Sequence, residues 1–190
     1  MQWFAGMWPF VVLGVVVTVS AVTDVRSGRV PNYVTYTGIA VGLIAHTLLG
    51  GLRGAEAGMG LYGSLAGFAA GFLPMLAVWL AGGIGGGDAK LMGAVGALTG
   101  WRFALSALFY GLLVALLLAA IVMLRKRIVR RTLRRLFRFL VLMMTPSRPA
   151  DPAAGQSEKV PFALALCIGS AAALVEALLR GPSAVKLLGF

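Results

Sequence analysis

Long apolar runs separated by short polar segments dominate this sequence and exclude a water-soluble fold. The first run, Trp3 to Thr23, contains no charged residue, and hydrophobic residues make up 59% of the 190-residue chain against 12% charged residues. A soluble domain is about half apolar and about a quarter charged, so a water-solvated core of this size could not bury so much apolar surface. A lipid bilayer is the solvent that suits such runs.

The runs predict an all-α, polytopic integral membrane protein with about six transmembrane helices. The expected spans are residues 3–23, 33–49, 61–81, 89–102, 103–124 and 161–179. A basic interfacial helix is expected at 125–140 and a linker at 146–158, within a single membrane-embedded domain over 1–190. The first span is expected to end at Asp24, and Asn32 is expected to cap the second.

The fourth span is short. About 12 residues of helix rise only ~18 Å, against a hydrocarbon core of ~30 Å. Two explanations stay open: the helix continues past Trp101 and Arg102, or Asp88 begins it below the membrane surface.

Glycines mark two further features. Gly63, Gly67 and Gly71 repeat every four residues, which predicts a seam where helix backbones approach closely in lipid. The segment 82–87 holds five glycines in six residues, and we expect it to interrupt the helix.

The charge is strongly one-sided, with 17 Lys and Arg residues, six acidic residues and a net charge of +11. Eight basic residues lie between Arg125 and Arg138, beside an apolar run, so we interpret them as contacts to anionic lipid and not to nucleic acid. The segments after odd-numbered spans carry thirteen basic residues and the other side four, which predicts that Asp24 and Asp88 face the cytoplasm.

Asp24 and Asp88 are the acids best placed for chemistry. Each stands where an apolar helix meets a short polar segment, and an ionisable group at membrane depth is costly. Capping a helix would explain either one alone. Brought together, two carboxylates share a proton: one serves as general base on a water while the other polarises a carbonyl. The glycines before Asp88 would let an extended substrate backbone pass close to the carboxylate.

Other reactive side chains lack partners in the sequence. His46, the only histidine, stands mid-span with no Cys or acid at ligand spacing, so we expect a core histidine and no metal or cofactor. Cys167 lies in an apolar helix and is expected to be inert packing. The glycine run lacks the Gly-Lys-Ser/Thr ending of a phosphate loop.

Three segments of the chain form recognisable motifs. They are Gly85-Gly86-Gly87-Asp88-Ala89-Lys90, then Asp24 with the later Val30-Pro31-Asn32 step and Thr35, and Lys159-Val160-Pro161-Phe162-Ala163. Together they resemble three motifs of the type IV prepilin peptidases, which are intramembrane aspartic proteases, and the first resembles the Gly-x-Gly-Asp-x-Lys motif of that family.

The resemblance implies a bacterial inner-membrane endopeptidase that removes the basic leader of prepilins or pseudopilins at the cytoplasmic face. It makes Asp24 and Asp88 the catalytic pair, without deciding which is base and which acid. It gives supporting roles to residues of the same motifs, namely Gly85, Gly87, Lys90, Pro31 and Asn32. The chain resembles the short branch that serves Flp/Tad-type pili, without the methyltransferase domain, so methylation is not expected.

Two other functions fit parts of the sequence. A small proton- or cation-coupled transporter subunit would use the same aspartates as a relay, but it would need polar residues spaced through the membrane depth. A membrane scaffold would explain the glycine seam and leave both aspartates without a role. The sequence does not fix the oligomeric state.

Overall fold

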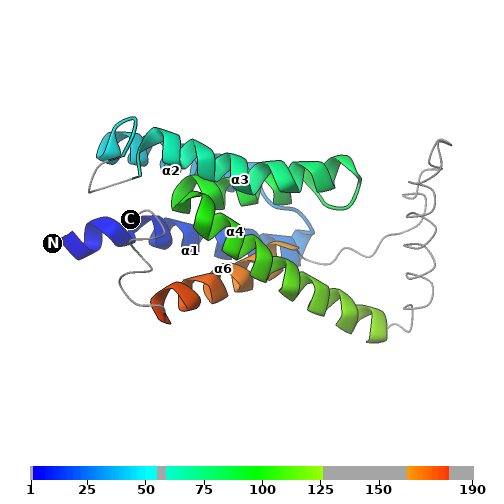
Figure 1. Ribbon diagram of the computed structural model, residues 1–190. Helices are drawn as coiled ribbons and strands as arrows, with labels where there is room; N and C mark the ends of the chain where they lie inside the picture. The colour runs from blue at the N-terminus through cyan, green and yellow to red at the C-terminus, as the bar shows by residue number, and fades with distance from the viewer. Residues whose placement is uncertain (1, 55–58, 126–161, 180–190) are drawn as a thin grey trace.

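The structure is a computed structural model that describes residues 2–54, 59–125 and 162–179, and the described chain is a bundle of helices (Figure 1). Its elements are α1 (Gln2–Ser27), α2 (Asn32–Gly50), α3 (Gly60–Leu80), α4 (Gly86–Arg125) and α6 (Phe162–Leu179). Each is long and apolar enough to cross a membrane. The predicted class, an all-α polytopic membrane protein, is confirmed for these residues.

The first helix runs further than the sequence predicted. α1 continues through Asp24 to Ser27, because Ser27 Oγ donates to the Thr23 carbonyl and the last turn continues through the polar residues. Gly28, at φ 62°, then ends the helix, and its backbone N–H donates a hydrogen bond to the Asp24 carbonyl at 2.8 Å. Asp24 therefore lies inside the last turn of α1 and not in the segment after it.

Two predicted spans, 89–102 and 103–124, form one element that breaks at Gly100. This residue has φ 78° and ψ 171°, a backbone conformation that favours glycine, and the two halves of α4 run in different directions from it (Figure 1). The expected count of about six spans thus corresponds to five elements, one of them bent. The interfacial helix at 125–140 and the linker at 146–158 fall almost wholly outside the described residues, and the single domain over 1–190 stays a prediction.

The break at Gly100 explains why the fourth span is short. Gly67, seven residues into α3, packs against Gly100, so the break lies about two helical turns inside the start of α3. At the other end of this half, Gly86 lies beside Trp79, next to the end of α3. The missing length is therefore at the Gly100 end.

Neighbouring side chains satisfy the carbonyl groups that this break leaves inside the bundle. Ser64 Oγ donates to the Ala97 carbonyl at 2.6 Å, and His46 Nε2 lies 2.9 Å from the Leu98 carbonyl. Both side chains are fully buried. Since an unsatisfied backbone group in lipid is expensive, these two contacts allow a helix to end at membrane depth.

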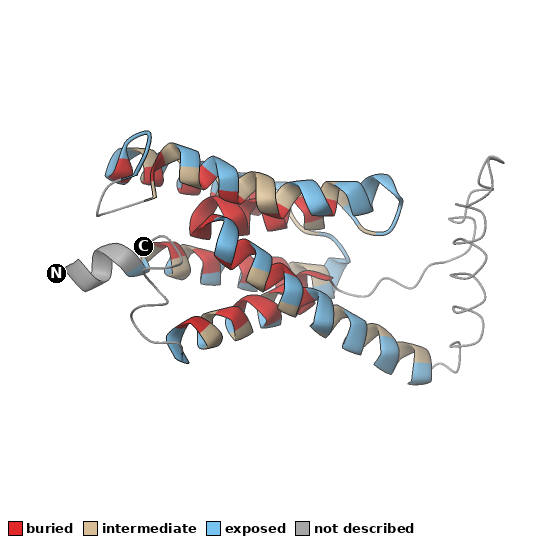
Figure 2. Cartoon of the chain, in the orientation of Figure 1, coloured by how far each residue is buried: buried red, intermediate tan, exposed pale blue. Residues whose placement is uncertain are grey.

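The predicted glycine seam joins α3 to the first half of α4. A Cβ on Gly67 would collide with the Gly96 carbonyl, and one on Gly71 would collide with the Met92 carbonyl. Gly63, the third member of the repeat, faces only the Met59 side chain. The first half of α4 is thereby enclosed, and Figure 2 shows buried residues on the inward faces and exposed residues outside. Many of the exposed residues are large and apolar, as suits a surface that faces lipid.

Candidate functional site

Four helix ends meet at one end of the bundle. α1 ends there, while α2, α4 and α6 begin there (Figure 1). This arrangement places Asp24, in the last turn of α1, and Asp88, in the first turn of α4, in the same region. Both side chains are half-buried, so each has a packed side and a side open to its surroundings.

Asp24 is fixed by the start of α6. Its Oδ2 accepts a hydrogen bond from the backbone N–H of Ala163, at 3.1 Å, across 139 residues of sequence. Ala163 is the second residue of α6, where backbone N–H groups have no partner within their own helix. The carboxylate of Asp24 therefore also caps a helix other than its own.

Asp88 stands in the first turn of α4, and its backbone N–H donates to the Gly85 carbonyl at 3.1 Å. Its carboxylate interacts with the backbone of Gly85 and lies close enough to Asp24 for the charges of the two groups to interact. A Cβ on Gly85 would stand 3.3 Å from Asp88 Oδ2, a tight contact that glycine avoids. The structure thus brings together the two aspartates that the sequence singled out.

The glycines before Asp88 pack against the protein's own chain. A Cβ on Gly87 would lie 3.1 Å from Val30 Cβ, and one on Gly86 would lie 3.2 Å from the indole nitrogen of Trp79. Gly87 therefore lets the start of α4 approach the segment that leads into α2. These close contacts are to Val30 and Trp79 of the same chain, and the expected approach of a substrate backbone stays a prediction.

Lys90 ties the start of α4 to the start of α2. Its Nζ donates to Asn32 Oδ1 at 3.1 Å and stands 5.0 Å from the centre of the Tyr36 ring. Asn32 does not cap α2 as the sequence predicted. Pro31 occupies the N-cap position, with φ −68° and ψ 130°, and the Asn32 side chain faces Lys90 instead.

The remaining reactive side chains lie elsewhere. His46 is a core histidine as expected, with its ring 4.9 Å from that of Trp8, near the break at Gly100. Cys167 is half-buried and packs against the apolar core. No group of three or more His, Cys, Asp and Glu residues within the described ranges is placed to hold a metal ion.

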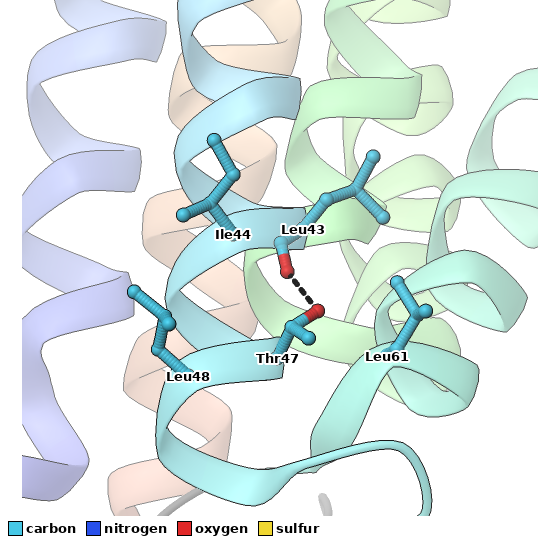
Figure 3. A pocket seen from close by; sticks show the side chains of 5 residues that line it. All are labelled: Leu43, Ile44, Thr47, Leu48 and Leu61. Carbon is cyan, nitrogen blue, oxygen red and sulfur yellow. Dashed lines mark hydrogen bonds between the residues drawn. The ribbon is translucent and has the colours of Figure 1, made fainter.

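An apolar pocket of about 280 Å³ opens near the other end of α2. Figure 3 shows its lining, which is Leu43, Ile44, Thr47, Leu48 and Leu61. The one polar group there, the Thr47 hydroxyl, already donates to the Leu43 carbonyl at 2.6 Å. This pocket lies at the far end of α2 from Asn32 and offers no reactive group.

The Ala163 N–H is the part of this arrangement that sequence reasoning missed. Its segment was noticed as a motif, but a backbone donor has no side chain to indicate a partner so distant in sequence.

Comparisons with known proteins agree with the motifs. The sequence model described as the type IV leader peptidase family matches residues 11–124, which include both aspartates. A prepilin leader peptidase/N-methyltransferase of Bacillus subtilis (strain 168) is 33% identical over 125 residues, or 66% of this chain and 48% of the relative. The chain thus spans about half the length of this curated relative. No solved structure matches.

Proposed function

Because the chain belongs to the type IV leader peptidase family, we propose that it is an intramembrane aspartic endopeptidase that cleaves the basic leader from prepilins or pseudopilins. The observation that carries this proposal is the meeting of Asp24 and Asp88 from two separate helices, close enough for their charges to interact. The Bacillus relative, a prepilin leader peptidase/N-methyltransferase, supports the same substrate class.

The chemistry follows from a pair of carboxylates that share one proton. The charged member takes a proton from a water, whose oxygen attacks the carbonyl carbon of the scissile peptide bond. The protonated member gives its proton to the carbonyl oxygen, which forms a tetrahedral diol. In the collapse of the diol, the protonated carboxyl delivers its proton to the leaving nitrogen and the C–N bond breaks. One diol hydroxyl gives its proton to the charged carboxylate as it becomes the carbonyl, so the pair again holds one shared proton.

The other motif residues act by holding the two aspartates in place. Gly85 leaves room beside the Asp88 carboxylate, and Gly87 allows α4 to approach Val30. Pro31 starts α2, and the contact between Lys90 and Asn32 then joins α2 to α4. Reacting groups that are held in a fixed orientation react faster, because less orientational freedom must be lost in the reaction.

We place this site at the cytoplasmic face of the bacterial inner membrane. The thirteen basic residues on the odd-numbered segments favour that orientation. The ends of α1 and α3 and the end of α4 at Arg125 lie at the same end of the bundle, as alternating spans require (Figure 1).

Co-expression with a prepilin tests the proposal. Asp24→Asn and Asp88→Asn should each lower cleavage by at least about 100-fold while the protein accumulates normally, because asparagine caps a helix as well as aspartate does. Glu176→Gln, a matched change near the far end of α6, should cleave like the wild type. Normal cleavage by either aspartate variant would remove that residue from the catalytic pair.

The relay hypothesis makes a different prediction for the same variants. Liposomes containing the wild-type protein would then carry a proton or cation flux that Asp88→Asn abolishes, and a prepilin would stay uncleaved. That pair of results would replace the peptidase with a transporter.

A further inference from the structure

The contact between α1 and α6 divides the aspartate pair into two unequal members. Asp24 Oδ2 accepts from the Ala163 N–H, and Ala163 is fully buried. Asp88 receives its backbone contact from Gly85, which is exposed in the turn before α4. The bond to Asp24 is partly buried and comes from a fully buried residue, and a hydrogen bond less exposed to water is electrostatically stronger.

An N–H donor favours the charged form of the carboxylate that accepts from it. The positive end of α6, whose first turn contributes the Ala163 N–H to Asp24, adds to this preference. Once Asp24 carries the negative charge, repulsion disfavours a second charge on the nearby Asp88. This difference in donors favours Asp88 as the member that carries the shared proton.

We propose that Ala163 is a positioning residue whose backbone N–H holds Asp24 as the charged member of the pair, so that Asp24 is the general base and Asp88 the general acid. This inference rests on the proposed peptidase function and assigns the roles within its site. It also gives the segment that opens α6 a specific task, which is to present one backbone donor to Asp24.

Other ionisable groups at this end of the bundle could also affect the pH dependence. They come from α1 and the segment after it, from α2 and from α4, and they are Arg26, Arg29, Tyr33, Tyr36, Asp88 and Lys90. On α6 the described ionisable side chains are Cys167, one turn after Ala163, and Glu176 near the far end. A test must therefore remove the Ala163 donor and leave every one of these side chains unchanged.

Ala163→Pro removes the N–H without removing a bond within α6, because proline is tolerated in the first turn of a helix. Ala163→Gly is the matched control, since it loses the methyl group but keeps the donor. The readout is kcat/KM across pH for a synthetic prepilin peptide that spans the leader cleavage site, with the full-length protein in liposomes. We expect the acidic limb of the Ala163→Pro profile to move up by about one pH unit, while the midpoint of the acidic limb stays unchanged in Ala163→Gly, whatever its maximal rate.

Because the proline ring must fit at a buried position, a second variant replaces only the amide. Lactic acid at position 163 keeps the methyl group and turns the N–H into an ester oxygen, and it should give the same shift of the acidic limb. A folded ester variant with a wild-type profile would overturn the inference, and the contact would then be a helix cap alone. A shift of the alkaline limb instead would reverse the two roles. Failure of the wild type to cleave would overturn the proposed function itself.

Discussion

Backbone groups at the two ends of the first half of α4 lack partners within the helix, and different side chains serve the two ends. At Gly100 the helix leaves carbonyls inside the bundle, and the neutral side chains of Ser64 and His46 satisfy them at fully buried positions. At the other end, the carboxylates of Asp24 and Asp88 contact backbone groups at the starts of α6 and α4, and both side chains stay partly exposed.

The difference suggests a division of roles: the end at Gly100 stabilises the fold, and the end with the two aspartates carries the proposed reaction. A neutral hydroxyl or imidazole closes a helix end inside lipid without introducing a charge, and complete burial leaves no room for a reactant. A carboxylate is a costly choice for the same task, and two close together repel each other. The proposed peptidase reaction would explain their presence at the open end, because it needs a shared proton and a cap alone does not.

The largest effect on stability is expected at the glycine seam between α3 and the first half of α4. Gly67→Ala would place a methyl group against the Gly96 carbonyl, and backbone atoms cannot move aside as a side chain does. We expect a loss of about 3 kcal/mol in the free energy of unfolding. Gly14→Ala, where nothing lies within 4 Å of the new Cβ, is the control for thermal unfolding in detergent. Equal stability of the two variants would contradict the packing described for α3 and α4.

A smaller loss is expected when one cap at the break is removed. Ser64→Ala leaves the Ala97 carbonyl buried without this donor, which costs about 1–3 kcal/mol. Thr37→Ala is the matched control, because that exposed hydroxyl bonds only to carbonyls of its own helix. Denaturant unfolding checks the difference. If Ser64→Ala stayed folded yet lost cleavage outright, the Gly100 end would take part in the reaction, and the proposed division of roles would be wrong.

The smallest effect is expected at the tie between α2 and α4. Lys90→Met removes the donor to Asn32 Oδ1 at an exposed site, so cleavage should fall by about threefold with unchanged protein levels. Asn32→Ala should cause a similar fall, and the double variant should be no worse than either single one, because both changes break the same contact. Initial cleavage rates give this comparison. Multiplied losses in the double variant would show that Lys90 acts independently of Asn32.

Much of this arrangement could be predicted from apolar runs and glycines. The bounds of α2, α3 and α6 fall within one residue of the expected spans, because a proline, a glycine or a charged residue lies at or just beyond each end. The interruption after Leu80 was equally plain, since Gly82, at φ 76°, lies in a run of glycines that no stable helix contains. Asp24 and Asp88 were found because each stands beside a recognisable motif.

The rest depends on contacts that local sequence does not encode. Gly100 is one glycine among 26, and its break becomes identifiable only once Ser64 and His46 are seen beside it. Asn32 follows a proline, where a capping residue was expected, yet its side chain accepts a hydrogen bond from Lys90, 58 residues away. Such choices are made by packing between distant helices, which overrides the local preference.

The most direct test of this division measures cleavage and thermal unfolding on the same purified variants. Asp24→Asn and Asp88→Asn should lose at least about 100-fold in cleavage and keep the wild-type unfolding temperature, while Ser64→Ala should unfold at a lower temperature and still cleave when folded. That crossed pattern is the result the account predicts. Aspartate variants that unfold early and cleave in proportion to their folded fraction would contradict it, because both ends would then only hold the bundle together.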